Sequence, residues 1–145
     1  MAAGLPSSTE KGDEERMTPQ AELLELIVKT AEENCDLDTP ISLEELPAEG
    51  GLYAELGEGF GNTTYYDKSA EKTLPVLFLC RHADQQRGLE ELCDICNYLQ
   101  RLKKYPQGNT FAWMDTEIAK EPNKIGRDED GVWHFSCILN CKVYY

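Results

Sequence analysis

The clearest structural pattern lies at the end of the chain, in Trp133-His-Phe-Ser-Cys-Ile-Leu-Asn-Cys-Lys-Val-Tyr-Tyr145. Every odd-numbered position holds an apolar or aromatic residue, and the positions between include His134, Ser136, Asn140 and Lys142. Alternation of period two is typical of a β-strand with one buried face. A register slip of one residue would expose that whole face, so the pattern predicts a fixed position in the sheet. It also predicts that Cys137 and Cys141 point into the core.

Two segments before this strand have helical periodicity. The first begins after Thr18, a good N-cap, with Pro19 in the first turn, and should end near Cys35. The second begins after Asp84 and should end near Lys104, before a turn that contains proline and glycine. Its expected apolar stripe consists of Leu89, Leu92, Cys93, Ile95, Cys96, Leu99 and Leu102.

Four other segments have the composition of strands. Two lie within residues 52–66, joined by a glycine-rich turn over 57–61, and the others cover 73–80 and 111–120. Strict alternation in the last of these places Trp113 and Thr116 on opposite faces. With 36–50 as a connection, the order is α–β–β–β–α–β–β. This order predicts an α+β fold, with an antiparallel or mixed sheet of about five strands and two helices packed on one face.

Residues 121–131 form a charged segment between the last two strands, which we expect to be a long hairpin loop. A calcium loop is a poorer explanation, because the ligand spacing is absent and basic residues interrupt the acidic ones. Long loops in compact domains are often functional. We therefore predict an interface for self-association or partner binding formed by Glu121, Asn123, Lys124, Arg127, Asp128, Glu129 and Asp130.

The first 17 residues are polar and lack periodicity, so we expect them to be disordered, and 18–145 to form a single domain. Lys11 to Arg16 is encoded by largely purine-rich codons, as a ribosome-binding site would be. Translation starting at Met17 is therefore an alternative hypothesis. Neither a signal peptide nor a membrane-spanning stretch is evident, which predicts a soluble, cytosolic protein with no membrane partner.

The chain has 145 residues and a formal net charge of −13. Such a charge opposes contact with phosphate backbones, so we expect no direct nucleic-acid binding. The only basic cluster singled out by the sequence is Arg101, Lys103 and Lys104, which is small for that purpose.

Six cysteines raise the question of thiol or metal chemistry. Cys93 and Cys96 form a CxxC motif, but inside a helix rather than at its N-terminus, where a reactive thiol would be activated. A zinc site would have to combine this pair with two of Cys80, His82, His134 and Cys141, and no second pair has ligand spacing. Neither histidine lies in a nucleophile motif. We expect no catalytic residue, metal or cofactor, with a small thiol or zinc enzyme as the contrasting alternative.

Several spaced blocks of sequence resemble a known family. They are Leu74-Pro-Val-Leu-Phe-Leu-Cys80, Asn97-Tyr98-Leu99 with Leu102-Lys-Lys-Tyr-Pro106, and the charged 121–131 segment followed by Ser136-Cys-Ile-Leu-Asn140. Over about 18–145 they are similar to minor capsid proteins of phages and prophages of Gram-positive bacteria, and the order of elements resembles siphophage tail terminators.

The resemblance implies a structural, non-enzymatic role in virion assembly. A tail terminator of this kind caps the tail tube as a ring, of six copies in the family, and joins the tail to the head. The implied partners are further copies of the chain, the major tail tube protein and head–tail connector proteins, with the mature location at the head–tail junction. Another head–tail connector or head-completion protein is the alternative within the same class.

Overall fold

The computed structural model describes residues 17–47, 50–64 and 70–145, and for 60–64 it describes the backbone alone. Most of the predicted disordered segment, and the question of a start at Met17, therefore lie outside the described residues. The elements follow in the order α2 (Pro19–Asn34), β1 (Ile41–Ser42), β2 (Gly51–Leu56), β3 (Phe60–Thr64), β4 (Ala70–His82), α3 (Gln85–Arg101), β5 (Ala112–Arg127) and β6 (Trp133–Tyr144).

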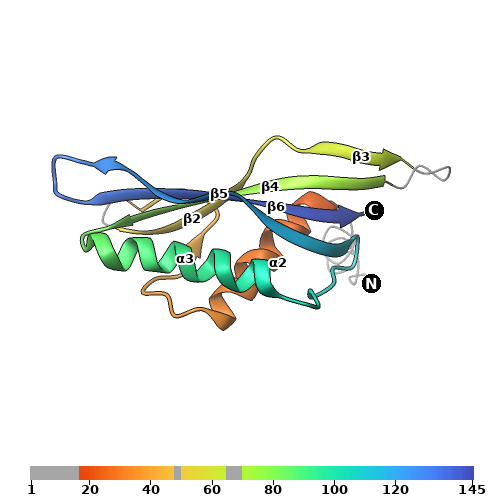
Figure 1. The fold of residues 1–145 in the computed structure, drawn as a ribbon, viewed down its shortest axis with the longest axis horizontal. Helices are drawn as coiled ribbons and strands as arrows, with labels where there is room; N and C mark the ends of the chain where they lie inside the picture. The colour runs from red at the N-terminus through yellow and green to blue at the C-terminus, as the bar shows by residue number, and fades with distance from the viewer. Residues whose placement is uncertain (1–16, 48–49, 65–69) are drawn as a thin grey trace, which may run out of the picture.

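All described strands belong to one sheet, whose order is β1-β2-β4-β6-β5, with β3 also paired to β4. The β1–β2 pair is parallel and the other pairs are antiparallel, so the sheet is mixed. Both helices cover the same face of this sheet: α3 packs on β4, β5 and β6, and α2 packs on β2 and α3 (Figure 1). The predicted α+β fold is confirmed.

Strand β6 lies inside the sheet, paired with β4 along one side and β5 along the other. Its odd-numbered residues from Phe135 to Val143 are all buried on the helix-covered side. The prediction made from the final strand is therefore confirmed, including the burial of Cys137 and Cys141. Because it is paired on both sides, β6 fixes the register of its neighbours.

Strand β4 is longer than predicted, and this changes the arrangement of the two strands before it. Strand β2 pairs with the 76–81 part of β4, and β3 pairs with the 70–73 part. The two strands thus follow one another along the same edge of β4. The segment between them, predicted to be a turn, simply connects the two strands along this edge. Gly57 marks the link, where its N–H donates to the carbonyl of Pro75 at 2.8 Å. The predicted connection over 36–50 also contains the short strand β1.

Both helices begin where their caps predict. The Thr18 hydroxyl accepts the N–H of Ala21 at the start of α2, and the Asp84 carboxylate accepts two N–H groups at the start of α3. Helix α3 ends at Arg101, earlier than the predicted Lys104, because the chain turns away at Leu102. In the described residues neither helix combines the length and apolar character that crossing a membrane requires.

The buried face of α3 is rotated from the predicted stripe. Leu92, Ile95, Cys96 and Leu99 are buried as expected, but Leu89 is 36% exposed and Cys93 is only half-buried. The reason is Gly88, where an added Cβ would lie 2.8 Å from the Phe135 ring. Since the helix approaches β6 at this glycine, the buried face runs through Gly88 and brings Glu91 into the interior.

Two predictions for β5 are wrong for a common reason, which is that this strand contains four register shifts. The first shift, between Trp113 and Asp115, places both Trp113 and Thr116 in the core, where the indole N–H donates to the Thr116 hydroxyl at 2.9 Å. The later shifts break the alternation that identifies a strand. Consequently, 121–127 belongs to β5, and the predicted long loop is a short turn over 128–132.

Candidate functional site

The β5–β6 hairpin brings all the predicted interface residues onto one projecting feature. At one end of the molecule the hairpin extends past the first turn of α3, whereas β3 and the start of β4 extend past both helices at the opposite end (Figure 1). Glu121, Asn123, Lys124 and Arg127 lie on β5, and Asp128, Glu129 and Asp130 lie in the turn. The sequence therefore predicted the location of this group but not its conformation.

Asp128 organises the turn. One carboxylate oxygen accepts the N–H groups of Asp130 and Val132, both at 3.0 Å. The other oxygen accepts from the Arg81 guanidinium and lies 3.2 Å from His134 Nε2. These contacts lower the pKa of Asp128 to about 2, and the hydrogen bond from the Val132 N–H makes the largest contribution. Asp128 therefore has a structural role and its charge is already matched.

Lys124 and Arg127 are held by the indole of Trp133. The Lys124 ammonium lies 4.9 Å from the ring centroid, and the Arg127 guanidinium carbon lies 5.2 Å from it. Cation–π contacts at these distances are favourable. Lys124 also donates to Gln85 Oε1 at 3.0 Å, which ties the hairpin to the first turn of α3. These cations therefore stiffen the base of the hairpin.

Asn123 has a similar internal function. Its side-chain amide donates to the carbonyl of Glu121 at 2.8 Å and to that of Ser136 at 3.1 Å. The second bond crosses from β5 to β6 beside one of the register shifts. Asn123 thus replaces backbone pairing that the irregular strand loses.

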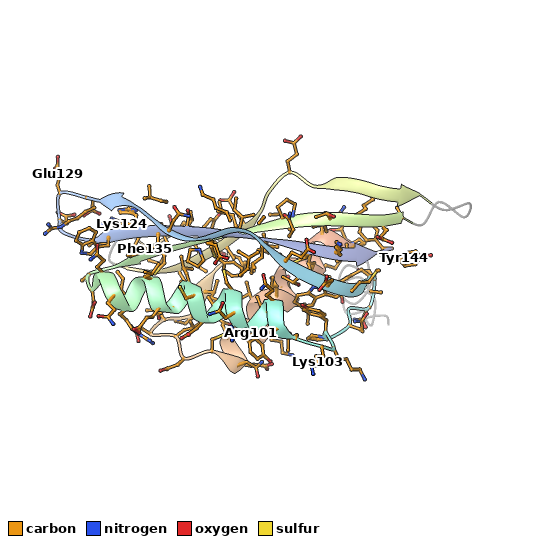
Figure 2. All side chains as sticks on the ribbon, viewed as in Figure 1. Arg101, Lys103, Lys124, Glu129, Phe135 and Tyr144 are labelled. Carbon is orange, nitrogen blue, oxygen red and sulfur yellow. The ribbon has the colours of Figure 1, made fainter. Side chains whose placement is uncertain are left out.

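Among the predicted interface residues, Glu121, Glu129 and Asp130 have exposed side chains that make no such bond to another described residue. Glu129 points away from the body of the protein at the end of the turn (Figure 2). Sequence reasoning missed one further residue, Ile125, which is 62% exposed. It lies at the register shift between Lys124 and Gly126, so the bulge turns an apolar side chain outward. The side chains of this group that remain available for contacts are therefore acidic, with one apolar side chain beside them.

A second polar cluster lies where α3 begins, around His82 at the end of β4. His82 Nε2 lies 2.8 Å from the Asp38 carboxylate, and Arg87 binds the same carboxylate with its nearest nitrogen at 3.1 Å. The buried Glu91 accepts the Asp38 N–H at 2.6 Å. The hydrogen bond from Arg87, followed by that from His82, lowers the pKa of Asp38. The cluster fastens the 36–39 connection to α3.

Asp38, His82 and Glu91 are also the group of potential metal ligands that the described residues bring together. Two observations make the fit poor. His82 Nδ1 accepts the N–H of Asp84 at 2.9 Å, so Nε2 carries the ring proton and offers no lone pair. The Arg87 guanidinium already occupies the Asp38 carboxylate. We therefore interpret the cluster as an ion-pair network.

The cysteines do not form the arrangement that a thiol or zinc enzyme would need. In the described part of the chain, no cysteine belongs to the potential ligand group, and Cys93 lies in the middle of α3. Burial raises the pKa of Cys93, and it raises that of Cys80 to about 12. An activated thiol needs the opposite shift. The CxxC motif therefore gives no structural support to the enzyme alternative.

A third surface combines several basic residues with apolar ones. An open groove of about 410 Å³ lies between α2 and the end of α3, with apolar walls that include Leu26, Tyr98 and Leu102. Lys29 and Lys104 line it on the basic side, and Glu33 is its acidic member. Arg101 and Lys103 lie beside it at the end of α3 (Figure 2). We call this surface the basic groove.

Taken together, the fold and these surfaces define a small α+β protein whose exposed features are suited to contacts with other proteins. The chain belongs to the family described as bacteriophage tail terminator protein, whose model matches residues 24–145. The match includes the whole sheet, α3, the hairpin and the basic groove. Comparison with curated proteins returned no match.

Proposed function

We propose that this protein caps the completed tail tube of a long-tailed phage as a ring and presents the other side of that ring to the head. The observation that carries the proposal is the family match, which extends over nearly the whole described fold. Terminating a tube requires a folded body that binds the last tube layer and surfaces that join neighbouring copies. The hairpin and the basic groove are candidates for those surfaces.

The proposed partners are further copies of this chain, in a ring of six, the major tail tube protein and the head–tail connector. The protein acts in the cytoplasm of a Gram-positive host during assembly and remains at the head–tail junction of the virion. Its net charge of −13 suits a component that lies beside the path of the DNA without holding it. No catalytic step is part of this role.

The hairpin is the first surface we assign to assembly, through Glu121, Glu129 and Asp130. Asn123, Lys124, Arg127 and Asp128 support it from within, by the bonds to Ser136, Gln85, Trp133 and Arg81 described above. A projection fastened at its base loses little conformational entropy when it binds a neighbour. This favours the hairpin over a flexible loop as a contact element.

Binding to tail ends tests the proposal directly. Tail tubes isolated from an infection that lacks this protein are mixed with the purified full chain and imaged by electron microscopy. We expect a ring of density at one end of each tube. Binding to empty or filled heads, with the tube ends unchanged, would overturn the tail-terminator assignment and favour the head-completion alternative.

A further inference from the structure

We infer that neighbouring copies join by placing the acidic tip of one hairpin in the basic groove of the next copy. The acidic tip consists of Ile125, Glu129 and Asp130, and the groove is completed by Arg101, Lys103 and Lys104. This inference rests on the proposed ring, and it assigns the two surfaces that build it.

The two surfaces are complementary in charge. Glu129 and Asp130 are exposed and make no side-chain ion pair among the described residues. Arg101, Lys103 and Lys104 at the end of α3 are also exposed and make no side-chain ion pair within the described part of the chain. In a chain with 27 acidic and 14 basic residues, these neighbouring cations beside an open groove favour an acidic partner.

The two surfaces are also complementary in apolar character. Ile125 is the most exposed of the large apolar residues in the described structure, at 62%. The groove offers apolar walls at Leu26, Tyr98 and Leu102. Burying the isoleucine there would remove apolar surface of both partners from water. The charges would then surround an apolar centre, as is usual in protein interfaces.

Their placement excludes an intramolecular contact and favours a ring. Glu129 lies at one end of the molecule, whereas Arg101 and Lys103 lie beneath its other half (Figure 2). The tip of one copy can therefore reach only the groove of another. Contacts between two different surfaces are heterologous, and they generate a closed ring when the rotation between copies permits.

Charge reversal in the full-length chain tests this contact on tail tubes prepared without the protein. One variant carries Glu129→Lys and Asp130→Lys, a second carries Arg101→Glu and Lys103→Glu, and a third combines all four changes. We expect each pair alone to reduce the amount bound to tube ends by on the order of tenfold. The combined variant should recover most of the binding, because the exchanged charges are again complementary.

A matched control separates this effect from the overall charge of the chain. Glu44→Lys with Glu45→Lys makes the same change in net charge at two exposed positions that follow β1, at the sheet edge opposite β5, and that do not line the groove. General repulsion between acidic subunits predicts that added lysines strengthen association at either place. The proposed contact predicts weaker binding for the Glu129 and Asp130 changes and no loss for the control.

A zero-length carbodiimide cross-linker gives a second readout on wild-type protein bound to tubes. This reagent joins a carboxylate to a lysine amine in direct contact as an amide, and takes up the lost water as a urea. With a mixture of isotope-labelled and unlabelled chains, we expect links between chains from Glu129 or Asp130 to Lys103 or Lys104.

Three outcomes separate the possibilities. Loss with each pair, recovery in the combined variant and the expected cross-links support the contact. Wild-type binding that persists in both single-pair variants, with cross-links elsewhere, overturns the contact but leaves tail capping intact. If wild-type protein does not bind tube ends, the proposed function fails, and the inference fails with it.

Discussion

The Asp128 carboxylate at the turn of the β5–β6 hairpin binds the Arg81 guanidinium near the end of β4, so the tip of the projection is tied to the sheet two strands away. His134 on β6 adds a further contact to the same carboxylate. The projecting hairpin is thus held as a rigid extension of the sheet. This rigidity supports the proposed role of the hairpin as a contact element.

Replacing Asp128 with asparagine should loosen the turn. The amide keeps the size of the side chain but loses the negative charge between Arg81 and His134 and accepts fewer N–H bonds. We expect the melting temperature at neutral pH to fall by a few degrees, measured by circular dichroism. Glu129→Gln, on the neighbouring exposed residue, is the control and should leave the melting temperature unchanged.

Acid titration should reveal the contribution of the Asp128 carboxylate to the stability of the fold. Its folded pKa of about 2 lies below the ordinary value of 3.8, so its ionised form stabilises the folded state. That contribution is complete above the unfolded pKa and is lost as the pH falls from about 4 to about 2. Asp128→Asn should therefore flatten this part of the stability curve. Equal acid sensitivity of the variant and the wild type would contradict the assignment.

Gly88 provides a test of the packing between α3 and β6. Alanine usually stabilises a helix relative to glycine by about 1 kcal/mol. Here the new Cβ would lie 2.8 Å from the Phe135 ring and 2.9 Å from His82 Cβ. We expect Gly88→Ala to destabilise the protein by about 1–3 kcal/mol in urea unfolding. Gly126→Ala, where nothing lies within 4 Å, should be neutral or stabilising.

The two faces of β6 should respond differently to truncation. Leu139 is fully buried beneath the helices, and its neighbour Ile138 is half-buried on the opposite face. We expect Leu139→Ala to cost about 2–5 kcal/mol of unfolding free energy, because it leaves a cavity in the core. Ile138→Ala should cost clearly less. Equal losses at the two positions would show that the register of β6 is different.

Thiol titration addresses the alternative of a thiol enzyme. Burial raises the pKa of Cys141 to about 12 and that of Cys35 to about 11, and a hydrogen bond with Cys96, followed by burial, raises that of Cys137. Native protein should therefore react slowly with a disulfide reagent at neutral pH, and all six cysteines should react after unfolding. A thiol that reacts rapidly in the native protein would revive the enzyme alternative.

The parts of this fold that could be predicted depend on local pattern. Thr18 and Asp84 predict where their helices begin, because a cap bonds to residues two or three positions away. The final strand is evident because its alternation is unbroken. Strand β5 was predicted too short because its bulges shift the alternation, and bulges leave no periodic signal.

Contacts between distant segments were equally invisible in the sequence. The Asp38–His82 pair joins residues that are 44 positions apart, and nothing local in either segment indicates the other. The seven predicted interface residues illustrate both cases. Their position on one hairpin follows from the order of strands, whereas the division into supporting residues, such as Asp128, and free ones, such as Glu129, depends on Arg81 and Gln85 from other elements.

Tail length in phage particles that lack this protein is the most direct measurement of its proposed role. A terminator stops the polymerisation of the tube, so its deletion should give tails of uncontrolled length that are not joined to heads, and supplying the wild-type gene should restore a single length. Electron microscopy of a deletion lysate provides the length distribution. Detached tails of normal, uniform length beside finished heads would contradict the account, because elongation would then stop without this protein.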